Sequence, residues 1–454
     1  THRDYGVEGG LAVEVPQLRF KDIFGHDVIK DRLAEVVHLL KDTSPRNELS
    51  LPRGMLLHGQ PGTGKTMLAK ALASEAGLPF IAASGPQLLQ IDTIRDIFRR
   101  ARQYAPCLVF LDEIDALGVR GRGGLDPCIN QLLVEIDGFK AADEGHVFVI
   151  AATNFRNKID PALTRSGRLD LCLEVPLLDR DARRHFLEKL QSETRLKAGE
   201  PFPMDELLEL SAGMSGADLD KLVREVQLTA IRRGLHEVTP ADLLEELNVI
   251  KHGARLDNPP LRAQMAVTAH HEAGHAVVSR ALNPDVRIEQ VTIVPRRNAL
   301  GFTAYSEESF SLRSFDRQEV MDLICVALGG RVAQRKYMAQ LEGDQALDKG
   351  SDAGAESDLR QATRLAWQAI TAWGLDTEFG WVSTQPWSDD AIIPASLEER
   401  ATQRVKAWID EARARTEQVV ETNWHVVRQL AEGLLTEEMI LGEKLASLLK
   451  GAQA

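Results

Sequence analysis

Apolar residues in the first half of the chain are arranged as buried strands that alternate with helices. Short, largely apolar stretches, typical of parallel strands covered on both faces, occur at residues 52–59, 107–111 and 147–153. Residues 28–40 and 67–76 instead place apolar side chains on one face of a helix. Strands that alternate with helices predict a parallel α/β sheet.

The remainder of the chain has a mainly helical pattern. Residues 181–251 show helical spacing that Pro201 and Pro203 interrupt, and Gly253–Pro260 breaks the pattern and predicts a domain boundary. Further along, we expect a helix around residues 265–282, a strand at 291–295, a helix that ends at 328–330, a helix over 356–373 and two C-terminal helices between 397 and 449.

Length and composition indicate several globular domains. The 454 residues are too many for one core, and a hydrophobic content of 44% is ordinary. The net charge of −13 argues against nucleic acid as a partner. No apolar run approaches the roughly 20 residues that a membrane helix needs, so the chain itself is expected to be soluble. The four cysteines form no CxxC pair, which favours free thiols in a reducing compartment.

A glycine-rich stretch joins the first buried strand to the helix at residues 67–76. It matches the phosphate loop, whose glycines free backbone N–H groups to wrap phosphate oxygens. Lys65 would reach the β- and γ-phosphates of ATP, and Thr66 would reach magnesium. A solvated turn is the alternative, but the strand before and the helix after favour the phosphate loop. Its eight residues are Gly59, Gln60, Pro61, Gly62, Thr63, Gly64, Lys65 and Thr66.

Polar residues at the ends of the next two buried strands suit nucleotide hydrolysis. Asp112 and Glu113 follow the run at 107–111, so a parallel sheet delivers both carboxylates to the edge that carries the phosphate loop. Asp112 would hold magnesium through water, and Glu113 would polarise the attacking water. Asn154 follows the strand at 147–153 and is placed to orient water or the γ-phosphate.

Two arginines three residues apart, Arg165 and Arg168, follow in the segment 160–168. A guanidinium group suits the charge that develops on a transferring phosphoryl group. Surface charge without such a role is the alternative interpretation.

The second half of the chain is organised around His-Glu-Ala-Gly-His at residues 271–275. His271 and His275 share one face of a helix, where their nitrogens can reach one tetrahedral zinc at about 2.0–2.1 Å. Glu272 can take a proton from a metal-bound water. A core helix that happens to carry these residues is the alternative. The chemistry requires a third ligand, and the candidates near one helix start are Asp352, Glu356 and Asp358.

These motifs, in this order, resemble the FtsH family of membrane-anchored AAA+ zinc proteases from about Phe20 to Leu449. The segments 151–154, 160–168 and 214–218 also fit. The resemblance implies an α/β AAA+ ATPase module, with a parallel sheet between two layers of helices and a helical lid. A mainly α zinc metallopeptidase domain would follow.

The resemblance also implies roles at the nucleotide site. Asn154 would be the sensor, and Arg165 and Arg168 would be fingers that reach the nucleotide of a neighbouring subunit. Gly216 and Ala217 would lie against the adenine and ribose.

For the metal site, the resemblance selects Asp358. Ser357–Thr363 matches the family's aspartate step before an Ala-Thr helix, so Asp358 would join His271 and His275 in holding one zinc per chain. A helix-start carboxylate that binds no metal is the alternative. The implied cofactors are therefore zinc, ATP and magnesium.

The expected domain organisation follows from the motifs and the helical pattern. We expect a lead-in at 1–19, the nucleotide-binding subdomain at 20–180, the lid at 181–252, a linker at 253–263 and the peptidase domain at 264–454.

By resemblance, the function would be ATP-driven unfolding of protein substrates and their degradation at the zinc site. The family implies a homohexameric ring that acts on unfolded or membrane proteins. It also implies a membrane anchor outside this chain, with these domains on the cytoplasmic, matrix or stromal side. A remodelling chaperone or scaffold with a vestigial metal site is the alternative, which the intact Glu272 disfavours.

Two departures from the family pattern stand out. Gln334 follows Gly-Gly-Arg-Val-Ala where the family usually has a glutamate, which weakens the expectation of a carboxylate behind the metal ligands. The segments 85–94 and 119–131 are several residues short, and the first lacks the aromatic pore loop of the family. If residues are missing there, the chain should be interrupted between Leu88 and Asp92 and between Gly121 and Cys128.

Overall fold

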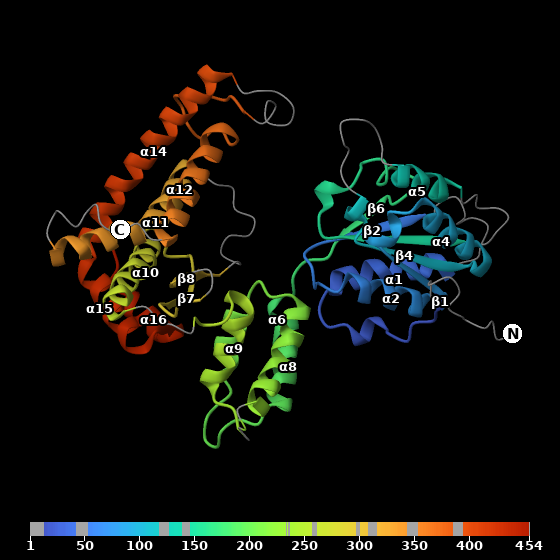
Figure 1. Cartoon of the computed structure of the whole chain (residues 1–454), viewed down its shortest axis with the longest axis horizontal. Coiled ribbons are helices and arrows are strands. Elements are labelled where there is room, and N and C mark those ends of the chain that lie inside the picture. The colour runs from blue at the N-terminus through green and yellow to red at the C-terminus, as the bar shows by residue number, and fades with distance from the viewer. Residues whose placement is uncertain are drawn as a thin grey trace. The chain divides into compact units, whose positions relative to one another are not determined.

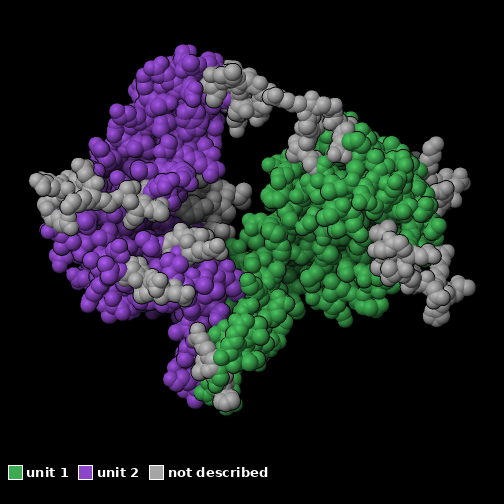
Figure 2. All heavy atoms as spheres, viewed as in Figure 1, with its two compact units in different colours: residues 1–195, 213–237 green, residues 196–212, 238–454 purple. Residues whose placement is uncertain are grey.

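In the computed structural model of the chain, two compact units are found: residues 1–195 with 213–237, and residues 196–212 with 238–454 (Figure 2). The residues that the structure describes are 13–41, 53–117, 127–138, 146–232, 234, 237–256, 261–296, 300–306, 316–342, 353–384 and 394–453.

The first unit is built on a six-stranded sheet in the order β1-β3-β4-β5-β2-β6, in which only the edge strand β1 is antiparallel. This confirms the predicted α/β fold. The parallel strands are almost wholly apolar because helices cover both of their faces. The strands are β1 (Val13–Glu14), β2 (Gly54–His58), β3 (Phe80–Ser84), β4 (Cys107–Asp112), β5 (Val147–Thr153) and β6 (Leu171–Glu174).

Two apolar layers sandwich this sheet. Successive residues of a strand point to opposite faces, so Leu57 packs with α1 and α2 while Leu56 packs with α4 and α5 (Figure 1). The helices of this unit are α1 (Asp27–Lys41), α2 (Lys65–Ala76), the short α3 (Gly85–Leu88), α4 (Ile91–Tyr104), α5 (Pro127–Asp137), α6 (Arg180–Glu193) and α8 (Gly216–Arg232).

The second unit is mainly helical, as expected, around the buried helix α10 (Arg262–Leu282). A small antiparallel sheet in the order β8-β7-β9 packs beside it. The other elements are α7 (Met204–Leu210), α9 (Pro240–His252), β7 (Ile288–Thr292), β8 (Phe302–Tyr305), α11 (Arg317–Glu342), α12 (Ala353–Thr371), α14 (Ala395–Thr422), α15 (Trp424–Glu437), β9 (Met439–Leu441) and α16 (Gly442–Leu449).

Three expectations for this half of the chain are corrected. The strand expected at 291–295 lies at 288–292, and the C-terminal region forms three helices instead of two. The helix expected to end at 328–330 continues to Glu342. Its glycines serve packing: a Cβ on Gly274 of α10 would lie 2.4 Å from the carbonyl oxygen of Gly329. The pair of glycines thus lets the backbones of α10 and α11 touch, and the packing outweighs the usual tendency of glycine to end a helix.

After β3, the shortened segment forms α3 and leads within two residues into α4. The interruption expected there stays a prediction. α3 ends at Leu88, and the carbonyl of Gln90 already accepts a hydrogen bond from the backbone N–H of Ile94 at 3.1 Å. The second shortened segment lies largely outside the described residues. No helix of the described part of the chain is long and apolar enough to cross a membrane.

Candidate ATP site and candidate zinc centre

The phosphate loop lies between β2 and α2 and holds its lysine in place. Lys65 Nζ donates hydrogen bonds to the carbonyl oxygens of Gly59 and Gln60 and to Oδ1 of Asn154, each at 2.8 Å. Burial lowers the pKa of Lys65. The negative charges of Asp112 and Asp115 act in the opposite direction but do not outweigh burial. The sequence-predicted lysine and asparagine, 89 positions apart, therefore meet at one point.

The second pair of predicted residues also meets there. Thr66 Oγ1 donates to Oδ2 of Asp112 at 3.0 Å, so the hydroxyl and the carboxylate are close enough to share one magnesium ion. Glu113 has a φ of 52°, a left-handed conformation that is uncommon outside glycine. Such backbone strain is concentrated at functional sites.

These residues line a pocket of about 620 Å³ within the first unit. Gly216 and Ala217 also line it, and the N–H of Ala217 donates to the carbonyl of Gly62 at 3.3 Å. An apolar wall that the sequence analysis did not identify completes the pocket. Its residues are Ile23, Phe24, Leu178 and Phe186, and it offers the flat apolar surface that an adenine ring requires.

The two arginines are not among the described residues that line this pocket. Arg165 is exposed. Arg168 instead forms a bidentate pair with Asp137, at 2.9 and 2.6 Å, and donates to the carbonyl of Ala162 at 2.6 Å. That hydrogen-bonded pair raises the pKa of Arg168 and lowers the pKa of Asp137. Arg168 is thus anchored within its own subunit, whereas Arg165 is free to extend.

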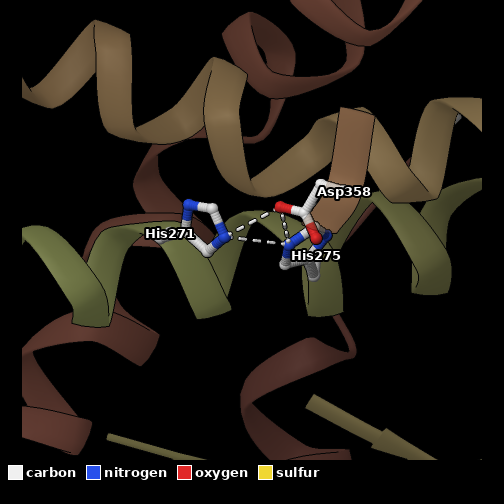
Figure 3. A group of neighbouring side chains, drawn as sticks. All are labelled: His271, His275 and Asp358. Carbon is white, nitrogen blue, oxygen red and sulfur yellow. Dashed lines mark hydrogen bonds and ion pairs between the residues drawn. The ribbon is translucent and has the colours of Figure 1, made fainter. Parts of the chain in front are cut away.

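The candidate zinc centre lies in the second unit and unites residues of α10 and α12. His271, His275 and Asp358 converge so that one ligand atom from each lies within 4.8 Å of the others (Figure 3). Asp358 Oδ2 is 3.0 Å from Nε2 of His271 and 3.1 Å from Nε2 of His275. Of the three candidates for the third ligand, Asp358 lies in the cluster, Glu356 pairs instead with Arg360 at 2.6 Å, and Asp352 lies outside the described residues.

The far nitrogen of each imidazole has a hydrogen-bond acceptor. Nδ1 of His271 lies 3.0 Å from Oε1 of Gln334, and Nδ1 of His275 lies 2.7 Å from the carbonyl of Val326. If both Nδ1 atoms donate, both Nε2 atoms present lone pairs to the centre, which is the tautomer that metal ligation requires. Gln334, which stands where the family usually has a glutamate, thus lies behind His271 and offers an amide oxygen in place of a carboxylate.

The electrostatics of this cluster favour a cation. Burial opposes the charged form of His271, but its hydrogen bond to Asp358 and the charges of Glu272 and Asp358 raise its pKa to about 9. Asp358 is correspondingly held well below its usual pKa, because the two histidines outweigh burial. Two nitrogens and one carboxylate oxygen form the protein donor set of a catalytic zinc site.

Glu272 lies beside this cluster and is itself buried, with 6% exposure. Burial raises the pKa of Glu272. The nearby histidines and a hydrogen bond from Thr303 act in the opposite direction, but burial is the larger effect. The hydroxyl of Thr303 is 3.0 Å from Oε2 of Glu272. Sequence reasoning missed Thr303, because nothing in the local sequence of β8 indicates a contact with α10.

Comparison with known proteins is consistent with both sites. Residues 55–177 match the ATPase family associated with various cellular activities (AAA), residues 202–245 the AAA+ lid domain, and residues 261–448 peptidase family M41. The ATP-dependent zinc metalloprotease FtsH of Thermus thermophilus is 35% identical over 469 residues, covering 97% of this chain and 72% of that protein. The FtsH protein of Neorickettsia risticii is 36% identical over 456 residues, covering 96% and 69%.

Proposed function

The chain belongs to the FtsH family of ATP-dependent zinc metalloproteases, and we propose that His271, His275 and Asp358 hold its zinc. Glu272 is the general base of peptide hydrolysis. The observation that carries this assignment is the convergence of two imidazole nitrogens and one carboxylate on a point beside Glu272. The remodelling alternative fits neither the peptidase match nor the named relatives.

Zinc and Glu272 have separate roles in peptide hydrolysis. When bound, zinc acts as a Lewis acid on the peptide carbonyl and lowers the pKa of water. The carboxylate of Glu272 takes a proton from the attacking water while the water oxygen bonds to the carbonyl carbon. The same carboxyl group returns the proton to the amine nitrogen as the C–N bond breaks.

At the nucleotide site, Gly59–Thr66 cradles the phosphates of ATP. Lys65 contacts the β- and γ-phosphates, and Thr66 and Asp112 hold magnesium. Glu113 polarises the attacking water, and Asn154 orients it. The contacts of Lys65 with Asn154 and of Thr66 with Asp112 support these roles. Gly216 and Ala217 face the adenine and ribose, together with the apolar wall around Phe24 and Phe186.

AAA membership implies an oligomeric ring that acts on protein substrates. We further propose that the ring is a homohexamer, that Arg165 and Arg168 serve a neighbouring subunit's nucleotide, and that a segment outside this chain anchors the protein in a membrane. The exposure of Arg165 supports its role, whereas the anchoring of Arg168 by Asp137 favours a supporting role for that residue.

The domain division proposed from the sequence is kept: 20–180 for nucleotide binding, 181–252 for the lid, 253–263 as linker and 264–454 for the peptidase. The matches at 55–177 and 202–245 lie inside the first two of these ranges, whereas the peptidase match, 261–448, begins three residues earlier than 264, within the proposed linker.

Zinc content measured together with casein cleavage tests the assignment. Glu272→Gln should keep one zinc per chain and lose cleavage by about 100-fold or more, because only the general base is removed. His275→Ala should lose both zinc and cleavage. Glu443→Gln, at the start of α16, is the matched control and should change neither quantity. Cleavage at the parent rate by metal-free protein would refute the proposal.

A further inference from the structure

Strand β8 lies directly against the proposed general base. Thr303 Oγ1 is 3.0 Å from Oε2 of Glu272 and 3.2 Å from the backbone carbonyl oxygen of the same residue. Just before the strand, a Cβ on Gly301 would lie 3.0 Å from Cγ of Glu272 and 2.8 Å from Cγ2 of Thr268. The Thr303 hydroxyl thus contacts the Glu272 carboxylate directly, and the space beside Gly301 is too small for a side chain next to Glu272.

The residue between these two contacts faces another helix. Phe302 packs against His252, the last residue of α9, with ring centroids 4.1 Å apart and the ring planes tilted by 40°. Nε2 of His252 is buried and has no hydrogen-bond partner among the described residues. Burial, together with the charges of Lys251 and Arg296, lowers the pKa of His252 to about 4. The ring is therefore neutral near pH 7 and acts on Phe302 as an apolar surface.

Helix α9 is fixed to the small sheet by buried polar contacts. The side chain of Asn248 accepts a hydrogen bond from Gln290 of β7 at 2.9 Å. Arg296, which is 3% exposed, donates to Glu245 at 2.9 Å and to the carbonyl of Gly253 at 2.6 Å. Such contacts are costly to break one partner at a time. These contacts join α9 to β7 and to the residues after it, and β7 pairs with β8 in the sheet.

We propose that Thr303 is a positioning residue for Glu272, and that α9 controls it through the contact of His252 with Phe302. The lid, to which the first residues of α9 are matched, would thereby adjust peptidase activity during the ATP cycle. The inference rests on the proposed role of Glu272 as general base. It assigns to β8 a mechanical link between nucleotide turnover and proton transfer.

Cleavage of a short unstructured peptide by the full chain tests the positioning role, since such a peptide needs no unfolding. Thr303→Val should lower kcat by about tenfold or more with KM and zinc content unchanged, because a misplaced base slows only the chemical step. Thr303→Ser keeps the hydroxyl and should restore kcat. Thr292→Val removes a threonine hydroxyl from the neighbouring strand, where it contacts Glu438, and should leave kcat unchanged.

Parent kcat in Thr303→Val, equal losses in the valine and serine variants, or loss of zinc would each overturn the positioning role. The proposed function is distinguished by Glu272→Gln. If that variant cleaves normally, the general base itself is wrong. If it is inactive while Thr303→Val is unaffected, only the present inference fails.

The link to α9 is tested by the ratio of peptide kcat with ATP to peptide kcat with ADP. His252→Ala should bring this ratio toward one, while His252→Phe keeps an aromatic ring against Phe302 and should preserve the ratio. The ATPase rate should stay at the parent value in both variants. Amide hydrogen exchange at residues 301–305 should be faster in His252→Ala. The proposed link between α9 and β8 would be overturned if the ATP-to-ADP ratio of kcat were one in the parent. It would also be overturned if His252→Ala changed neither this ratio nor amide exchange at residues 301–305, or only one of them.

Discussion

Single residues divide the work at the ATP site between binding and hydrolysis. Lys65 is buried and held by three oxygen acceptors at the base of the phosphate loop. Glu113 lies beyond Asp112, on a strained backbone at the strand end. Binding and hydrolysis should therefore respond to different substitutions.

Lys65→Ala should abolish ATP binding, because the phosphates lose their only cation in the loop sequence 59–66. Glu113→Gln should bind ATP but hydrolyse it about 100-fold or more slowly, because only the residue that polarises water is changed. Equilibrium binding of a fluorescent ATP analogue and phosphate release measure the two effects. Hydrolysis at the parent rate in Glu113→Gln would remove Glu113 from this role.

Residues whose function depends on neighbours in sequence could be found from the sequence. The phosphate loop and the two histidines of α10 are local patterns, since a loop or a single helical turn brings them together. Gln334 and Thr303 act on His271 and Glu272 from other elements. Their positions follow from tertiary packing, which no local pattern records. Asp358 was selected among three candidates by family resemblance, because chemistry alone could not choose.

At the level of elements, the same contrast appears in α11. Its glycines at 329 and 330 suggested a helix end, yet they lie where the helix crosses α10. Buried strands were located well because an uninterrupted apolar run is itself the signature of a covered parallel strand. The short strands β8 and β9 have no such signature, since each is only a few residues long and packs on one side.

Helix α9 carries a pH-dependent contribution to stability. The pKa of His252 is about 4 in the folded protein and about 6.5 when unfolded, so the unfolded state binds more protons between these values. The stabilisation from this pKa difference is fully present above pH 6.5 and is lost as the pH falls toward 4. Thermal unfolding from pH 7 to pH 4 should show a shallower loss in His252→Phe than in the parent.

The exposed His425 of α15 provides the matched control for this measurement. His425→Phe should retain the pH dependence of the parent, because the side chain of His425 is exposed in the folded protein as well as in the unfolded chain. Identical slopes in the parent and in His252→Phe would contradict the assignment of the effect to His252.

At the scale of the whole molecule, the nucleotide pocket is formed by the first unit without Arg165. An exposed arginine that acts on phosphate must therefore do so on another subunit. ATPase activity should then depend on assembly of the ring.

Mixed rings test this dependence. Lys65→Ala subunits retain Arg165, and Arg165→Ala subunits retain a working phosphate loop, so mixing them should restore part of the hydrolysis that each lacks alone. Mixing Lys65→Ala with Glu113→Gln should restore none, because each interface still lacks a residue of its own pocket. Failure of the first mixture at every ratio, in rings shown to be mixed, would exclude action between subunits through Arg165.

The close packing of α11 on the histidines makes the metal site vulnerable to one methyl group. A Cβ on Gly330 would lie 2.3 Å from Nε2 of His275 and 2.6 Å from Nε2 of His271. Those distances approach the zinc–nitrogen bond length of about 2.0–2.1 Å, so the methyl group would compete with the ion for the same space. Gly330→Ala should therefore abolish zinc binding, measured by metal analysis, while His271, His275 and Asp358 all remain. A descendant of this protein could lose its protease activity with every ligand and the general base still in its sequence.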